Sequence, residues 1–87
     1  MILIDANSEK EFKEGHIKGA KNMDFFNPKL YDEIATLDKS KTYLIYSRRD
    51  HRKDKVMDAF RTASIFKLIG LKGGLSAWES ENLPVEK

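Results

Sequence analysis

Residues 42–46 read Thr-Tyr-Leu-Ile-Tyr, and residues 47–52, which follow directly, read Ser-Arg-Arg-Asp-His-Arg. The first five residues are β-branched, aromatic or aliphatic, a composition typical of a buried strand. The next six include no apolar residue and predict a loop. Beyond them, apolar residues recur at helical spacing over about residues 53–63. The stretch therefore predicts a strand, a polar loop and a helix in immediate succession.

Two other apolar segments predict further strands. They are residues 1–5, Met-Ile-Leu-Ile-Asp, and residues 65–69, Ile-Phe-Lys-Leu-Ile. Residues 16–22 lack periodicity and are expected to be an extended connection, and residues 75–81 are expected to form a last short helix. Strands that alternate with helices, and that read as continuous apolar runs, are typical of a buried parallel sheet. We therefore expect an α/β fold, a small parallel sheet flanked by helices on both faces.

Capping residues predict where two of the helices begin and end. Ser8 and Glu11 have the spacing of a capping box, and Gly15 is suited to the position that follows a helix. Asn27 followed by Pro28 has the pattern of an N-cap and a first helical residue. We therefore expect one helix between Ser8 and Gly15 and a second that starts at Asn27.

The composition is that of a globular protein. The chain has 87 residues, of which 40% are hydrophobic and 34% charged, values that argue against disorder. We expect one domain over residues 1–87. No apolar run approaches the roughly 20 residues of a membrane span, and no signal-peptide pattern is visible, so we expect a cytoplasmic protein without a membrane partner. The absence of cysteine excludes disulfides, thiolate metal sites and a thiol nucleophile within this chain.

Three of the four arginines in the chain, Arg48, Arg49 and Arg52, fall in the predicted loop. Ligands of parallel sheets bind beyond the carboxyl ends of the strands, which is where this loop lies. Arginine side chains, backbone N–H groups and the start of a helix all favour an oxyanion. The loop is therefore a candidate site for a small anion of the thiosulfate, sulfate or phosphate class. Arg52 is expected to point inward, because it closes the loop at the helix start.

Three segments, taken in order, resemble the rhodanese-homology domain, a sulfurtransferase fold. They are Leu3-Ile4-Asp5; Glu11-Phe12 with residues 15–20 (Gly-His-Ile-Lys-Gly-Ala) and Asn22; and residues 71–75 (Leu-Lys-Gly-Gly-Leu) with Ala77-Trp78 and Leu83-Pro84-Val85. The resemblance covers nearly the whole chain. It implies a parallel sheet flanked by helices and an active-site loop of the form C-x-x-G-x-R after the central strand. In this chain that loop corresponds to residues 47–52.

Three departures from the family's pattern bear on function. Ser47 stands at the position of the catalytic cysteine, Asp50 at that of the loop glycine, and Asn7 at that of an arginine that commonly follows the first strand. The family's reaction requires a thiolate that carries sulfur as a persulfide, and a serine hydroxyl offers no such exchange. Arg52 matches the loop arginine, so the anion-holding half of the site is expected to remain. If the loop keeps the family's path, Asp50 adopts a left-handed conformation at some cost.

Two functions from different classes follow from these departures. The first is a catalytically silent domain whose loop residues, Ser47, Arg48, Arg49, Asp50, His51 and Arg52, bind a small oxyanion or contact an unidentified protein in a regulatory role. The second is a thiosulfate sulfurtransferase whose catalytic cysteine is replaced by Ser47. A structural role with an empty loop is a third interpretation.

Other chemistry finds little support in the sequence. His51 is too close to Ser47 in the chain to be aligned with confidence as a base, and the resemblance implies a structural His16. Neither histidine has the spacing of a metal site, so no metal and no cofactor are expected. Acidic residues interleave with the basic ones around the loop, which argues against a nucleic-acid partner. These acidic residues are Asp50, Asp54 and Asp58.

Overall fold

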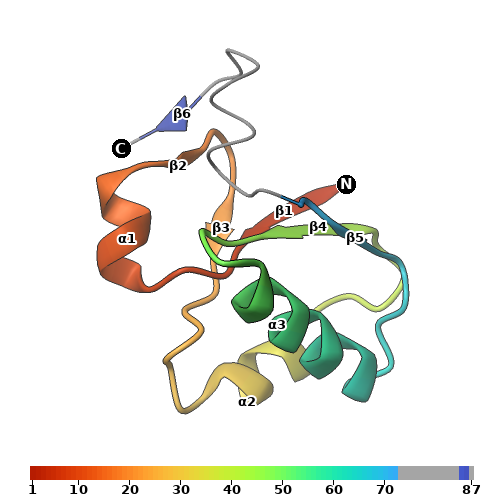
Figure 1. Ribbon diagram of the computed structural model, residues 1–87. Coiled ribbons are helices and arrows are strands. Elements are labelled where there is room, and N and C mark those ends of the chain that lie inside the picture. The colour runs from red at the N-terminus through yellow and green to blue at the C-terminus, as the bar shows by residue number, and fades with distance from the viewer. Residues whose placement is uncertain (73–84, 87) are drawn as a thin grey trace.

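Four parallel strands form the central sheet of the computed structural model, which describes residues 1–72 and 85–86 (Figure 1). The strands occur in the order β3-β1-β4-β5, so the expected parallel sheet and α/β fold are confirmed. The elements, in chain order, are β1 (Ile2–Asp5), α1 (Glu9–Glu14), β2 (His16–Ile17), β3 (Lys21–Asn22), α2 (Leu30–Ala35), β4 (Tyr43–Tyr46), α3 (Asp50–Thr62), β5 (Leu68–Gly70) and β6 (Val85–Glu86).

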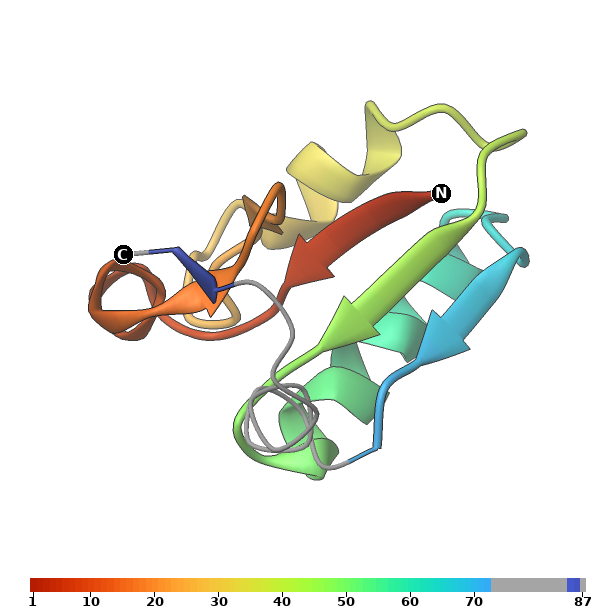
Figure 2. The ribbon, with the colours of Figure 1, turned by 90° about the horizontal axis from the view of Figure 1, so that it is seen from above.

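The strand register brings the functional positions to one edge of the sheet. Asp5, the last residue of β1, is paired with Tyr46, the last residue of β4. Figure 2 shows β1, β4 and β5 pointing the same way, so their carboxyl ends lie together. At that edge β4 leads directly into α3. Strands β2 and β6 form a separate antiparallel pair.

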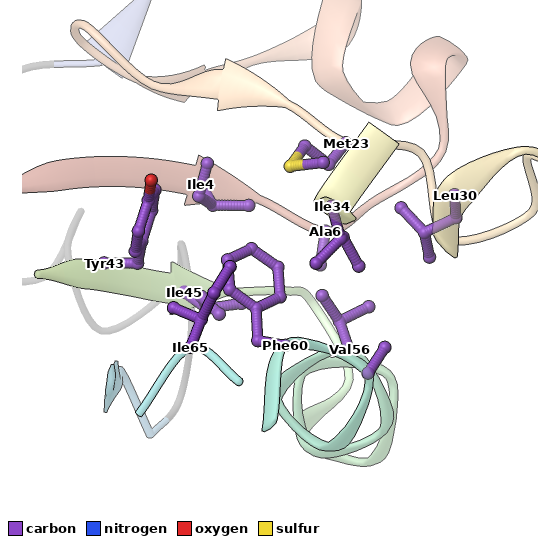
Figure 3. Close-up of a cluster of buried hydrophobic side chains, with 11 residues drawn as sticks. Ile4, Ala6, Met23, Leu30, Ile34, Tyr43, Ile45, Val56, Phe60 and Ile65 are labelled. Atoms are coloured by element: carbon purple, nitrogen blue, oxygen red, sulfur yellow. The ribbon is translucent and has the colours of Figure 1, made fainter. Parts of the chain in front are cut away.

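The main core lies between the sheet and the two helices α2 and α3, which cover the same face (Figures 1 and 3). Alternate residues of β4 point to opposite faces, as expected for a strand. Tyr43 and Ile45 join the main core, and the Tyr43 ring packs edge-on against Phe60 of α3, with ring centroids 5.4 Å apart. The other buried members are Ile4, Ala6, Met23, Leu30, Ile34, Val56, Ala59 and Ile65.

A smaller apolar cluster lies on the opposite face of the sheet. Leu44 and Tyr46 of β4 pack there with Ile17 of β2, and Leu3, Ala20 and Leu71 lie against them. The helix expected over residues 75–81 lies outside the described residues. None of the helices within residues 1–72 is long and apolar enough to cross a membrane.

Three elements differ from the sequence-based predictions. The strand expected over residues 65–69 is β5 at Leu68–Gly70, so it begins three residues later than predicted. Residues 16–22 contain β2 and β3 rather than a plain connection, and β3 pairs with β1 as an edge strand. Such two-residue strands are too short to show periodicity. The second helix starts at Leu30 rather than at Asn27, because the Asn27 side chain accepts a hydrogen bond from the Lys29 amide and stabilises a turn first.

The first helix begins as predicted, but its end differs in detail. The capping box is present: the Glu11 amide donates to Ser8 Oγ at 3.2 Å and the Ser8 amide donates to Glu11 Oε1 at 3.0 Å. Gly15 follows the helix as expected, yet its φ of 160° is extended rather than left-handed. The chain therefore passes directly from α1 into β2.

Candidate functional site

The predicted six-residue loop is shorter in the structure. Only Ser47, Arg48 and Arg49 connect β4 to α3, and Asp50, His51 and Arg52 form the first turn of the helix. The expected helix start near Lys53 is therefore wrong by about one turn. The first turn projects polar side chains, so apolar periodicity could not mark it. An acidic residue at the first helical position, Asp50, is favoured by the helix dipole.

Ser47 is fully buried, and its hydroxyl is part of the helix start. The hydroxyl donates a hydrogen bond to the carbonyl of Arg49 and accepts one from the Lys53 amide at 3.0 Å. In α1 the corresponding carbonyl and amide pair directly, Phe12 N to Ser8 O at 2.9 Å. The Ser47 hydroxyl thus bridges the two backbone groups that otherwise form the first hydrogen bond of a helix.

Asn7, which occupies the position of the family's arginine, contacts the same loop. It is fully buried, and its Oδ1 atom accepts a hydrogen bond from the Arg48 amide at 2.8 Å. The backbone N–H of Asn7 donates to Asp5 Oδ1 at 2.8 Å, and Asn22 Nδ2 donates to the backbone carbonyl of Asn7 at 3.0 Å. Within the described part of the chain, Asn7 Nδ2 has no hydrogen-bond partner. A buried donor is thus left beside the loop.

The arginines of the site differ in their surroundings. Arg52, as expected, is the inward one: its side chain is 16% exposed, and its Nη1 atom lies 2.7 Å from Glu11 Oε1. Its guanidinium carbon also lies 5.0 Å from the centroid of the exposed Phe26 ring. Arg48 lies 4.0 Å from Glu11 Oε2 and 3.4 Å from Glu14 Oε1. Arg49 is exposed at the N-cap of α3 and provides no side-chain cap.

Glu11 is a site residue that sequence reasoning identified as a helix cap and as part of a family motif, but not as a partner of the arginines. Burial by itself raises the pKa of its carboxyl. Hydrogen bonds from the backbone and side chain of Ser8, together with the hydrogen bond and charge of Arg52, outweigh burial and lower the pKa below its ordinary value. Glu11 is therefore charged at neutral pH. The signal in the sequence was the excess of arginines over acidic residues in residues 47–52, which indicates that an acidic partner comes from another segment.

Asp50 and His51 lie at the surface of the first turn. Asp50 is half-buried, and its Oδ1 atom lies 3.6 Å from Lys53 Nζ. The expected left-handed conformation of Asp50 is wrong, because the residue is helical; among the described residues other than glycine, Ser64 is the one with a positive φ. His51 is exposed, whereas Lys53 is buried although it follows directly in sequence.

A buried polar group lies next to this site at the ends of β1 and β4. Tyr46 donates its hydroxyl to Asp5 Oδ2 at 2.6 Å and accepts a hydrogen bond from the Ile17 amide at 3.0 Å. Burial raises the pKa of Asp5, although hydrogen bonds from Tyr46 and Asn7 and the charge of His16 partly offset it. The His16 ring is hydrogen-bonded through Nδ1 to the Phe12 carbonyl at 2.8 Å and stacks on the Phe12 ring. These contacts connect secondary-structure elements.

No cavity opens beside these groups in the part of the chain that the structure describes. Within residues 1–72 and 85–86, no group of three His, Cys, Asp or Glu side chains could hold a metal ion. An anion would therefore bind at the surface of the loop, against Arg48, Arg49 and the first turn of α3.

Comparisons with known proteins agree with this fold. The Rhodanese-like domain family matches residues 1–81. The crystal structure of the Rhodanese_3 like domain from the Alr3790 protein of Anabaena sp superposes with a TM-score of 0.91 at 28% identity, over 100% of this chain and 99% of that chain. The chain belongs to the rhodanese-like domain family, which confirms the resemblance seen in its sequence motifs.

Two curated relatives show how far the similarity extends. A Bacillus subtilis (strain 168) protein named "Putative sulfurtransferase YtwF" is 31% identical over 84 residues, which are 97% of this chain and 79% of that protein. An uncharacterized protein of Buchnera aphidicola subsp. Baizongia pistaciae is 30% identical over 97% of this chain. This chain spans 59% of the length of the Buchnera protein.

Proposed function

We propose that this rhodanese-like domain is a catalytically silent module that binds small oxyanions of the thiosulfate, sulfate or phosphate class at residues 47–52. The observation that carries the proposal is the state of Ser47. Its hydroxyl is buried and engaged by two backbone groups at the position where the family places its sulfur-carrying thiolate. The position therefore supports the helix rather than a reaction.

The surroundings of Ser47 also argue against nucleophilic catalysis by the hydroxyl. A serine nucleophile requires an adjacent base that accepts its proton. The Ser47 hydroxyl instead donates a hydrogen bond to the Arg49 carbonyl, which does not act as a base. His51 is exposed on the helix, and the His16 ring is bound to the Phe12 carbonyl. Neither histidine is thus held against the hydroxyl by a hydrogen bond that the structure describes.

Anion binding is supported by the groups that gather at the start of α3. The exposed Arg49 lies at the N-cap of a 13-residue helix, where the helix dipole favours negative charge. Arg48 and Arg52 already flank a carboxylate, that of Glu11, which indicates the type of group that they accept.

A sulfurtransferase remains the second candidate, in which Ser47 replaces the catalytic cysteine of an active enzyme. It is favoured by the 31% identity to a Bacillus subtilis protein named as a sulfurtransferase, although that name carries the word "putative". An acidic group on an unidentified protein partner would satisfy the same arginines as a free oxyanion. The cytoplasmic location stays a prediction from the sequence.

The proposal is tested by NMR titration with thiosulfate. We expect a dissociation constant in the millimolar range, with the amides of residues 48–52 shifting first. Arg52→Ala should abolish these shifts, because it removes a cation and leaves the Glu11 carboxylate uncompensated beside the loop. Arg61→Ala, which removes the fourth arginine at the far end of α3, is the matched control and should leave them unchanged.

Two results would contradict the proposal. The largest shifts would lie away from residues 47–52, or the unmodified chain would form thiocyanate from thiosulfate and cyanide. The first result would remove the anion site. The second would favour the sulfurtransferase, by a mechanism that does not use a thiol of this chain.

A further inference from the structure

The carboxylate of Glu11 lies between the arginine side chains that were expected to hold an external anion. Its Oε1 atom lies 2.7 Å from Arg52 Nη1, and its Oε2 atom lies 4.0 Å from Arg48 Nε. Glu11 belongs to α1, whereas both arginines belong to the loop and first turn after β4. The arginine pair therefore already holds an anion, one that a distant segment of the same chain supplies.

This internal carboxylate is fixed in place before any ligand arrives. The capping box with Ser8 holds both its backbone and its side chain, and the side chain is 21% exposed. The lowered pKa of Glu11 keeps it charged at neutral pH. A group held within the chain competes at a high effective concentration and loses little entropy on binding. A free ion must overcome both advantages.

We propose that Glu11 is an internal ligand of the Arg48–Arg52 pair and that it restricts the loop to doubly charged oxyanions. The proposal rests on the anion binding proposed above. A monoanion that displaces Glu11 only exchanges one negative charge for another and loses its translational freedom. A dianion brings a second charge, which the exposed Arg49 and the N-terminus of α3 are placed to receive. Sulfate, thiosulfate and hydrogen phosphate are ions of this kind.

The test compares sulfate, a dianion, with formate, a monoanion that carries the same carboxylate as Glu11. The amides of residues 47–52 are followed by NMR at neutral pH and constant ionic strength. In the unmodified protein we expect shifts with sulfate and none with formate. In Glu11→Gln, which keeps the oxygen that accepts from the Ser8 amide, we expect sulfate to bind about tenfold tighter and formate binding to appear.

Two further variants keep the result interpretable. Glu9→Gln removes the same charge from the same helix, but Glu9 pairs with Lys13 at 3.0 Å and not with the arginines. Its affinities should stay within about twofold of those of the unmodified protein. Glu11→Asp keeps the charge but withdraws the carboxylate from Arg52 by one methylene group. It should shift the affinities in the same direction as Glu11→Gln, and it guards against a folding defect specific to the amide.

The outcomes separate the two proposals. If Glu11→Gln and the unmodified protein bind both ions equally at residues 47–52, Glu11 is not an internal ligand, while anion binding at the loop stands. An equal gain in Glu9→Gln would also overturn the role of Glu11, since net charge would then explain the effect. If sulfate shifts none of these amides in any variant, both proposals fall together.

Discussion

Lys53 donates its backbone N–H to the side-chain oxygen of Ser47 at 3.0 Å, six residues earlier in the chain. The Ser47 hydroxyl in turn donates a hydrogen bond to the carbonyl of Arg49, so one hydroxyl contacts two backbone groups at the start of α3. Ser47 therefore has a structural role of its own at the position where the family has its cysteine. The residue that removes the family's nucleophile also stabilises the start of the helix that carries Arg52.

Removal of the Ser47 hydroxyl should therefore destabilise the domain. We expect Ser47→Ala to lower the free energy of unfolding by about 1 kcal/mol, because the buried Lys53 amide loses its acceptor, whereas the Arg49 carbonyl keeps the hydrogen bond from the Arg52 amide at 3.0 Å. Chemical denaturation followed by circular dichroism measures the change. Ser40→Ala is the control, since that hydroxyl belongs to an exposed residue and donates to the Asp38 side chain, a neighbour in the same turn. Equal stability of Ser47→Ala and the unmodified protein would show that the bridge contributes nothing.

Restoring the family's glycine at position 50 should destabilise the domain as well. Asp50 is helical, its charge lies in the first turn of α3, and it lies 3.6 Å from the buried Lys53 ammonium group. Asp50→Gly loses helix propensity and this charge, which we expect to cost about 1 kcal/mol. Asp50→Asn, which keeps a side chain, should cost less. A rise in melting temperature for Asp50→Gly would instead support a left-handed loop.

Strands β1 and β4 could be predicted from the sequence because each is a continuous apolar run. The four residues of β4 are buried, and the alternation of strands with helices indicated a parallel sheet. The order of the strands and the edge strand β3 were not predicted. The capping box of α1 was predictable because it depends on neighbours in sequence, Ser8 and Glu11. Where several polar residues compete for the same turn, as at Asn27, the helix start could not be predicted.

The location of the site could be predicted from the sequence, but the contacts between its side chains could not. Its place at the end of β4 follows from the chemistry of parallel sheets, and Arg52 is the least exposed of the three arginines, as expected. The contacts of Arg52 with Glu11 and of Arg48 with Asn7 join residues 41 positions apart. Such pairings depend on tertiary packing, which a pattern of neighbours does not contain. The Ser47 bridge was missed because the helix was expected to begin later.

Among the described residues other than glycine, the one with a left-handed backbone conformation lies at the other end of α3. Ser64 has a φ of 65°, and the Ile65 amide donates to the Phe60 carbonyl at 3.0 Å, as in a Schellman motif. Glycine adopts this conformation without strain, so Ser64→Gly should raise the free energy of unfolding by about 0.5–1 kcal/mol. Ser64→Ala, which keeps the strain, is the comparison and should show no gain. Thermal unfolding distinguishes the two variants, and a loss of stability in Ser64→Gly would contradict the assignment.

The Glu11–Arg52 ion pair should make the free energy of unfolding decrease as the pH falls into the acidic range. Since the folded-state pKa of Glu11 is lowered from 4.5, the charged carboxylate stabilises the fold above that value. The contribution is lost as pH falls through the folded-state pKa. Glu11→Gln should therefore be less stable at neutral pH, by less than about 1 kcal/mol, and equal to the unmodified protein in strong acid.

The comparison of Glu11→Gln with the unmodified protein separates the contribution of Glu11 to the pH dependence of stability from that of the other carboxyl groups. Asp5, whose pKa burial raises, contributes with the opposite sign, because its share of stability is lost as pH rises through its folded-state pKa. Asp5 is present in both proteins and cancels. Glu9→Gln, which removes the same charge from the same helix but from a pair with Lys13, is the control variant. A stability difference for Glu11→Gln that persists unchanged into strong acid would mean that the ion pair is not its source.

The last prediction concerns catalysis: Ser47→Cys should gain a feeble thiosulfate–cyanide sulfurtransferase activity that the unmodified chain lacks. A sulfur at this position would lie beside the Lys53 amide and the N-terminus of α3, which lower the pKa of a thiol and favour the thiolate. Full burial acts in the opposite direction, and Glu11 occupies Arg52, so the activity should be small. Thiocyanate formation measures turnover, and intact mass reports an added sulfur atom on the cysteine. Ser40→Cys, with an exposed thiol away from the site, is the control and should show no turnover. A folded Ser47→Cys variant that takes up no sulfur would mean that the loop has lost the geometry of the reaction together with its nucleophile.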